Sequence, residues 1–304
     1  MISFFAGLIS GTIMYGAPLL YCTLGEVIGQ RAGMVNLGLE GIMLVGAAAG
    51  FTVAAGTGNM WLGVLLAALA GAALNLVYAF LVVNRQANQL ASGLTVMFLG
   101  TGLSAMIGRS YIGSGISGLA RYQIPGVSAF SWVRSTMFSY DLLVYLVVPA
   151  AVFAWWGLFR TKWGLHLRVV GEDPSAAFAA GLKIPALQYQ AQLANGFLAG
   201  LAGAHLSLAV ARAWTEGMIG GRGFIAIALV IFSKWHPLRA IAGALLFGGS
   251  VTLQLQLQAR GSSISPFLLN MIPYVLTLGV LMIWGGVRRF AAPAALGRVY
   301  SGEE

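Results

Sequence analysis

The sequence has few charged residues and a single cysteine. Only 8% of its 304 residues are charged, whereas a soluble domain carries about 25%, and 59% are hydrophobic. This composition excludes a soluble globular protein and predicts a polytopic membrane protein. Cys22 lies in an apolar run, so an internal disulfide bond or a cluster of thiolate metal ligands is also excluded.

Motifs for catalysis and nucleotide hydrolysis are missing as well. No G-x-x-x-x-G-K-[ST] string occurs, so the chain has no P-loop with which to hydrolyse ATP. His166, His205 and His236 form no H-E-x-x-H motif, and no G-x-S-x-G elbow is present. The segment 113–118 matches G-x-G-x-x-G by chance, because it lies in a turn-rich loop with no preceding strand. We therefore expect no catalytic residue, no metal site and no cofactor bound by this chain.

The net charge of +9 needs an explanation other than nucleic acid. The basic residues lie in loops between apolar runs, and lysine and arginine are retained on the cytoplasmic side of membrane proteins. We attribute the excess charge to membrane topology and expect lipid, not nucleic acid, around the protein.

Long apolar runs predict the fold. A helix that crosses a bilayer needs about 20 mostly apolar residues. Runs of this kind lie at 4–23, 34–56, 60–83, 90–108, 139–159, 188–211, 238–258 and 267–287, and a shorter run at 223–233 follows a glycine-rich string. The sequence thus predicts one all-α polytopic domain over 1–304, with about eight to nine transmembrane helices and broken or re-entrant segments.

Charged loops predict the orientation. The loop 160–187 and the tail with Arg288, Arg289 and Arg298 should both be cytoplasmic, which requires an even number of crossings between them. The run 223–233 must then cross or nearly cross. Counting backwards places the loop 109–138 and the N-terminus outside, although Arg109, Arg121 and Arg134 in that loop oppose the rule. The N-terminus has no basic region before its apolar run, so we expect a retained first span.

A short helix is predicted inside the loop 160–187. Asp173 suits the N-cap, Pro174 suits the first helical position, Gly181 suits the left-handed C-terminal cap, and Pro185 should prevent the helix from resuming. Two turns are marginal alone in water. The small apolar surface fits either a partner's groove or the membrane surface.

Ionisable residues within apolar segments mark candidate sites, because they are costly in lipid. Glu40 lies close to Asn36 in a glycine-rich stretch. Glu216 and Arg222 flank the glycine-rich residues 217–221 that precede the short apolar run. Both layouts are typical of broken helices that line a substrate cavity, and they suggest an inverted repeat. The structural alternative is that Glu216 pairs with Arg222 and that Glu40 bonds a neighbouring helix end.

Weaker candidates for a polar pathway are Asn88, Gln89, Ser92, Asn195 and His205, although a lone histidine is more often a satisfied core residue. Small residues four apart occur at 7/11, 46/50, 196/200 and 199/203, and we interpret only the 196–203 group as a helix interface.

Four strings then resemble a known family. They are GEVIGQRAGMVNLGLEGIMLVGA (25–47), VVGEDPSAAFAAGLKI (169–184), NGFLAGLAGAHLSL (195–208) and TEGMIGGRGFIAIALVIFSKWHPLRAIAGALLFG (215–248). The sequence resembles ABC-transporter permeases of the branched-chain amino acid and ribose superfamily. It looks closest to the branch that handles nucleosides and simple sugars with a BmpA-like lipoprotein receptor.

The resemblance implies an importer permease in a bacterial cytoplasmic membrane. It implies that ATP is bound by a separate ATP-binding cassette subunit, and that a second permease chain, identical or different, and an external binding protein complete the assembly. The cytoplasmic helix would be the coupling helix, and the residues matching its contact are Asp173, Pro174, Ala177, Gly181 and Leu182. The loop 109–138 departs from the family pattern, which leaves the receptor-facing surface open.

Rival functions remain at this point. An ion-coupled secondary transporter or channel would carry protons on Glu40 or Glu216 and would need no ATPase. An intramembrane enzyme is disfavoured by the missing nucleophile–base pairs, and a scaffold predicts no polar cavity.

Overall fold

The computed structural model describes residues 2–123, 139–261, 265–284 and 292–298. Most of them are helical, which confirms the predicted all-α architecture. The helices are α1 (Ile2–Arg31), α2 (Leu39–Thr57), α3 (Met60–Ala79), α4 (Gln89–Gly108), α6 (Leu142–Arg160), α7 (Lys162–Glu172), α8 (Pro174–Ala179), α9 (Ile184–His205), α10 (Arg222–Phe232), α11 (Pro237–Ala259) and α12 (Pro266–Trp284). Short π-helical turns, η1 (Phe80–Asn84) and η3 (Leu206–Val210), extend α3 and α9, and η2 (Arg109–Tyr111) follows α4.

Among the described residues, seven helical segments are long and apolar enough to cross a bilayer, and they contain α1, α2, α3, α4, α6, α9 and α11. Two further apolar helical stretches, α10 and Phe267–Leu276 within α12, are shorter. This set agrees with the predicted eight to nine helices, some of them broken. β1 (Arg121–Gln123) and β2 (Ser139–Asp141) form a small antiparallel hairpin at one end.

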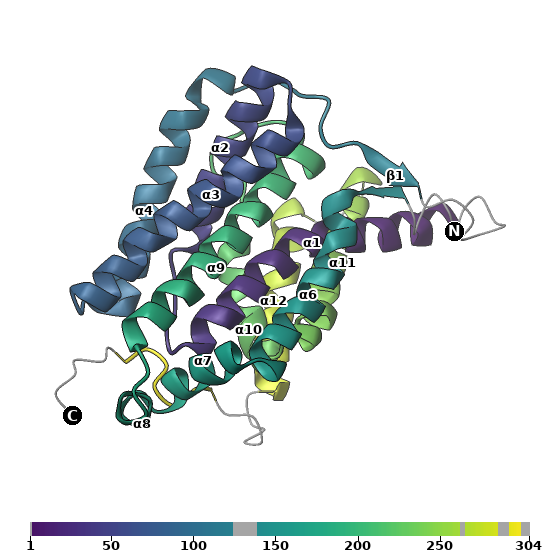
Figure 1. Ribbon diagram of the computed structural model, residues 1–304. Coiled ribbons are helices and arrows are strands. Elements are labelled where there is room, and N and C mark those ends of the chain that lie inside the picture. Colours follow the sequence, from purple (N-terminus) through teal and green to yellow (C-terminus); the bar gives the residue numbers. More distant parts are fainter. Residues whose placement is uncertain (1, 124–138, 262–264, 285–291, 299–304) are drawn as a thin grey trace.

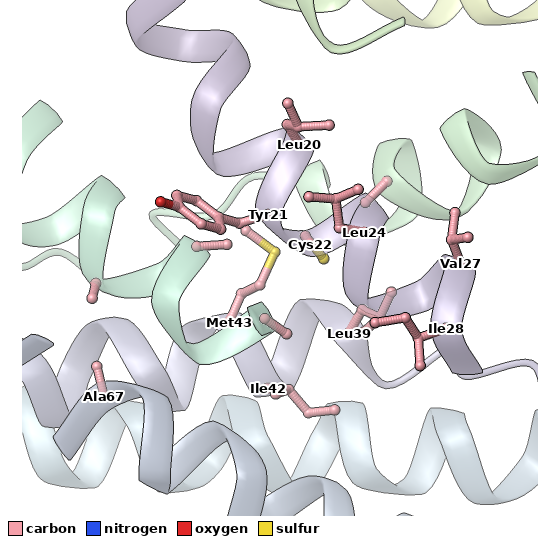
Figure 2. Close-up of a cluster of buried hydrophobic side chains, with 14 of the residues drawn as sticks. Leu20, Tyr21, Cys22, Leu24, Val27, Ile28, Leu39, Ile42, Met43 and Ala67 are labelled. Atoms are coloured by element: carbon pink, nitrogen blue, oxygen red, sulfur yellow. The ribbon is translucent and has the colours of Figure 1, made fainter. Parts of the chain in front are cut away.

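Helices α1 and α9 lie at the centre of the bundle (Figure 1). α9 packs against α1, α2 and α3, and α1 packs against α9, α10, α11 and α6. Figure 2 shows the buried side chains between α1 and α2, with Cys22 and Leu24 facing Leu39 and Met43. Cys22 is therefore a small core residue.

Glycines allow α9 to approach its neighbours closely, as the 196–203 spacing predicts. A Cβ on Gly196 would lie 2.5 Å from Asn75 Cβ in α3, and a Cβ on Gly46 in α2 would lie 2.7 Å from Gly200 Cα. The pair at 7/11 also meets another helix: a Cβ on Gly7 would lie 2.7 Å from the Gln256 amide in α11. Limiting the interface prediction to 196–203 was wrong, because the other spacings are packed too.

Two helix boundaries differ from prediction. α1 continues to Arg31, well past the predicted end at 23, and α2 begins only at Leu39. The extension of α1 contains the buried polar residues Glu26 and Gln30. Because these residues lower the local hydropathy, the hydropathy pattern placed the end of the helix too early. Residues 32–38 are irregular backbone, and a second irregular stretch, 211–221, separates η3 from α10.

One end of the bundle, here called the basic end, gathers many of the basic residues. It contains the end of α1, the loop after η1, α7, α8, the loop before α11 and the described tail 292–298 (Figure 1). Its basic residues are Arg31, Arg85, Arg160, Lys162, Arg168, Lys183, Lys234, Arg239 and Arg298. This is the end that the charged loops predict to be cytoplasmic. The tail contacts α7 directly, which confirms that the two lie on one side, while Arg288 and Arg289 lie outside the described residues.

The opposite end holds the start of α1, the hairpin and the loop after η2 (Figure 1). The described part of the predicted external loop is 109–123, and Arg134 lies outside the described residues. Within this part, the Ile116 N–H bonds the Arg212 carbonyl at 3.1 Å, and the Leu119 N–H bonds the Leu208 carbonyl at 3.0 Å. This loop thus packs on η3 and on the irregular stretch that precedes α10.

Candidate functional site

The two broken segments meet at Glu40. This residue lies in the first turn of α2, and its carboxylate reaches the start of α10. Oε1 accepts a hydrogen bond from the Gly221 N–H, and Oε2 accepts one from the Gly223 N–H, each at 2.8 Å. Gly221 is the N-cap of α10, has φ of +82° and offers no side chain of its own. Glu40 therefore supplies the cap that α10 lacks.

This cap has a clear physical basis. The first N–H groups of a helix have no partner within the helix, and in the membrane no water is present to satisfy them. Negative charge is also favourable at a helix N-terminus, and Glu40 lies at two of them. The carboxylate thus holds the starts of α2 and α10 together.

The meeting point lies deep in the bundle. α10 has 11 residues, so it rises about 16 Å, roughly half of a 30 Å hydrocarbon core. It ends near the basic end, where Trp235 donates a hydrogen bond to Gln30, while α2 runs to the opposite end. The half-length α10 and the longer α2 thus begin at one point, each after an irregular stretch, which is the layout predicted from the sequence.

Arg222 and Glu216 do not form the ion pair considered above. Arg222 Nη1 donates to the carbonyl oxygens of Met218 at 3.1 Å and Ile219 at 2.7 Å, within the turn before α10. Glu216 is exposed on the irregular stretch. Arg222 therefore braces the turn that presents Gly221 and Gly223, whereas the structural alternative for Glu40, a bond to a neighbouring helix end, is confirmed.

Asn36 and Asn195 belong to a second, fully buried cluster that is joined by Glu26. Glu26 Oε1 accepts from the Asn36 N–H at 3.1 Å and from Gln30 Nε2 at 2.8 Å, and Oε2 accepts from Asn195 Nδ2 at 2.8 Å. Asn36 also accepts from the Gly38 N–H at 2.7 Å, just before α2. The cluster thus fixes the broken stretch 32–38 to α1 and α9.

Two more amides extend this cluster into α3. Asn36 Nδ2 donates to Asn75 Oδ1 at 2.6 Å, and Asn75 Nδ2 donates to the Gln192 carbonyl at 2.6 Å and to its Oε1 at 3.0 Å. Gln192 Nε2 and Asn195 Oδ1 have no hydrogen-bond partner among the described residues. Sequence reasoning missed Glu26, Asn75 and Gln192. A usable sequence signal was the pair of glycines four residues apart, Gly25 and Gly29, on either side of Glu26. In the structure, a Cβ at either position would press on Asn195.

The candidates on α4 lie at the basic end. Asn88 is exposed and caps α4, accepting from the N–H groups of Leu90 at 3.0 Å and Ala91 at 3.1 Å. Gln89 bonds the Val35 N–H and the Gly33 carbonyl, at 2.8 and 3.2 Å. Ser92 is buried. The Gln89 contacts support the stretch 32–38, and a role for Asn88 or Ser92 in a pathway stays a prediction.

His205 pairs with a residue that the sequence did not indicate. Its Nε2 lies 3.2 Å from Asp141 Oδ2, and both side chains are buried. Asp141 also caps α6 by accepting from the Leu143 N–H at 3.0 Å. Burial alone would raise the pKa of Asp141, but the hydrogen bond and charge of His205 outweigh it and lower that pKa. The pair joins α6 to α9 near the end opposite the basic end.

The short helix α8 forms as predicted. Asp173 accepts from the Ala176 N–H at 3.0 Å and Pro174 occupies the first turn. At the other end Gly181 has φ of +77°, and its N–H and that of Leu182 bond the Phe178 and Ala177 carbonyls at 2.9 and 3.0 Å, which is a Schellman motif.

Two details of the prediction for this loop were wrong. Pro185 does not stop a helix but occupies the first turn of α9, where its missing N–H is tolerated. Ala177 is fully buried within this chain, so it does not face a partner. The neighbouring Phe178 is 65% exposed and borders a groove of about 610 Å³ with Gly181 and Leu182.

Residues 8–283 match the model of the family described as the branched-chain amino acid transport system permease component. The chain belongs to this family of ABC-transporter permeases. A provisionally named glucose ABC transporter permease protein of Haloferax volcanii is 38% identical, with 99% of each chain covered. A nucleoside permease of Lactococcus lactis is 33% identical and a guanosine permease of Bacillus subtilis is 32% identical, each with 96% of both chains covered.

Family membership decides between the rival functions. The protein is the permease subunit of an ABC importer, a multi-pass transporter component and not an enzyme. An ion-coupled mechanism on Glu40 or Glu216 is not supported: both oxygens of Glu40 cap α10, and Glu216 lies exposed outside the cluster.

Proposed function

We propose that this permease imports a nucleoside or a simple sugar across the cytoplasmic membrane by alternating access. Separate ATP-binding cassette subunits supply the energy at the basic end. An external binding protein delivers the substrate at the opposite end. Two permease chains, identical or different, form the complete pathway.

The observation that carries this proposal is the Glu40 cap on α10. It joins two broken helices deep in the bundle through two charge-assisted hydrogen bonds, each worth about 1.5–3 kcal/mol. A contact of this size can be exchanged during a transport cycle when partner proteins bind one conformation better than the other. Glu40, Gly221 and Gly223 would then form a gate, and Arg222 would keep the turn in place.

The supporting residues divide into two groups. Asn36 and Asn195, through Glu26, hold the frame against which the gate moves, while Glu40 and Arg222 lie at the gate itself. The proposed pathway also includes Asn88 and Ser92 at the start of α4 and Glu216 on the irregular stretch 211–221.

The helix α8 is the proposed contact with the ATPase. It lies at the basic end, both of its ends are capped, and the exposed Phe178 borders an apolar groove. Asp173, Pro174, Gly181 and Leu182 shape this surface, and Phe178 replaces Ala177 in the proposed contact. Movement imposed on α8 passes directly to α7, because Asp173 ends one helix and begins the other.

The substrate class rests on the relatives. Two are named for nucleosides and one for glucose. Nucleosides and sugars share a hydroxyl-bearing ring, which carboxylate and amide groups can hydrogen-bond. A thermal-shift screen of the partner binding protein against nucleosides, sugars and amino acids separates these classes.

The function is tested by reconstituting the permease with its ATPase subunits and binding protein in proteoliposomes. We expect uptake of labelled guanosine or glucose only with ATP on the ATPase side, and none when the ATPase P-loop lysine is replaced. Uptake by the permease alone, driven by an ion gradient, would overturn the proposal.

A further inference from the structure

The described tail, residues 292–298, lies across the basic end beside α7 and α8 (yellow in Figure 1). Its backbone is bonded to two separate parts of the chain. The Ala295 N–H donates to the Gly171 carbonyl at 3.0 Å, and the Ala294 N–H donates to Glu172 Oε2 at 3.1 Å. The Gly297 N–H donates to the Gly33 carbonyl at 3.2 Å. The tail therefore links the end of α7 to the start of the broken stretch 32–38.

Beneath the tail, α7 and the broken stretch touch through two glycines. A Cβ on Gly171 would lie 3.1 Å from the Gly33 nitrogen, and it would also clash with the Arg31 carbonyl. Gly33 has φ of +84°, a conformation that favours glycine. Ala295 covers this joint and is only 6% exposed, and Leu296 packs against the main core. The joint is thus closed on its outer side by the tail.

From this joint the contacts continue towards the gate. Gln89 donates to the Arg298 carbonyl at 2.8 Å and to the Gly33 carbonyl, and it accepts from the Val35 N–H. Asn36 is the next residue after Val35, and it accepts a hydrogen bond from the Gly38 N–H, two residues before Glu40. One short segment thus contacts both the helix next to α8 and the stretch that positions Glu40.

We propose that residues 292–298 act as a coupling strap, which keeps the end of α7 and the broken stretch 32–38 moving together during transport. This inference rests on the proposed function, because it assumes that α8 receives the movement of an ATPase. Without the strap, α7 can move while Gly33 and Glu40 stay in place. ATP hydrolysis then continues but produces little transport.

The first test removes the strap by ending the chain after residue 291. The matched control ends the chain after Arg298 and removes only 299–304. In proteoliposomes with the partner subunits, we expect the shorter chain to retain receptor-stimulated ATP hydrolysis while substrate transported per ATP falls about 10-fold or more, within the usual range of coupling free energies. The control should behave as the full chain. Equal transport per ATP in both truncated chains would overturn the proposal.

A second pair of variants decides the question if the truncated chain fails to assemble. Ala295→Phe forces a large side chain into the covered joint, whereas Ala294→Phe places it at an exposed position on the same segment. We expect Ala295→Phe alone to lower transport per ATP while assembly and hydrolysis persist. Equal transport per ATP in the two variants, or a parallel loss of hydrolysis and transport in Ala295→Phe, would contradict the strap.

The two proposals fail in different ways. If the full-length complex shows no ATP-dependent uptake, the proposed function fails. If it transports normally and the strap variants do so as well, only the strap fails.

Discussion

Glu40 and Gly223 are in direct backbone contact. A Cβ on Gly223 would lie 2.5 Å from the Glu40 nitrogen and 2.7 Å from its Cα, in addition to the hydrogen bond between the Gly223 N–H and the Glu40 carboxylate. Only glycine permits the starts of α2 and α10 to approach so closely. Through this contact, the glycine-rich string 217–223 and the carboxylate of Glu40 belong to the same proposed gate.

Replacing Gly223 tests this packing. Gly223→Ala should lower the free energy of unfolding by about 1–3 kcal/mol through overpacking, and it should reduce uptake because the cap is displaced. Gly102→Ala is the control: Gly102 is also helical, and a Cβ there meets nothing within 4 Å. Thermal unfolding in detergent and uptake in proteoliposomes measure both effects. Similar behaviour of the two variants would argue against a tight gate.

The charge of Glu40 gives a second prediction. Glu40→Gln leaves one of the two N–H groups facing an amide donor, so we expect a stability loss of about 1–3 kcal/mol and a fall in transport. Glu216→Gln makes the same chemical change at an exposed site and should leave the stability unchanged. If Glu216→Gln abolished transport while Glu40→Gln did not, Glu40 would not be the gate residue.

The buried carboxylate of Glu26 gives a third prediction. Glu26→Leu removes the acceptor for Gln30, Asn36 and Asn195, and each buried donor left without a partner costs about 1–3 kcal/mol. Glu26→Gln keeps the size and one acceptor oxygen, so its loss should be smaller. Melting temperatures in detergent compare the two. Equal melting temperatures would mean that the cluster does not hold the broken stretch in place.

The pH dependence of stability follows from His236, in the loop before α11. Partial burial of the ring lowers its pKa, and the charges of Arg239 and Arg31 lower it further. Below its usual pKa of about 6.5, the unfolded chain therefore binds this proton more readily than the folded one. Stability should fall as the pH drops below about 6.5 and recover above it.

The matched variant is His236→Phe, which keeps an aromatic ring against Phe159, 5.2 Å away between ring centroids. It should show a smaller loss of melting temperature between about pH 7.5 and 5.5 than the unchanged protein. If His236→Phe lost as much melting temperature as the unchanged protein, the pH dependence would come from other groups.

Local signals predicted the helices and α8 well. Hydropathy located the spans, and Asp173, Pro174 and Gly181 predicted both ends of α8, because caps depend on a few neighbouring residues. The glycine-rich layouts around Glu40 and Arg222 also predicted where helices break. In each case the cause lies within a few positions of the chain.

Long-range partners were not predictable in the same way. Glu26 meets Asn195 across 169 positions, and Asp141 meets His205 across 64, so neither pair leaves a local pattern. Pro185 was misinterpreted because proline both ends one helix and begins the next. Ala177 was misplaced because a resemblance does not tell which face of a two-turn helix is buried.

The most direct test of the central claim is site-specific photo-cross-linking in the intact complex. A photoreactive residue at Phe178, on α8 at the basic end, should cross-link to the ATP-binding cassette subunit. The same group at Thr57, exposed at the opposite end of the bundle, should not. Cross-linking from Thr57, or none from Phe178 in a complex that transports, would contradict the claim that α8 receives the movement that drives import.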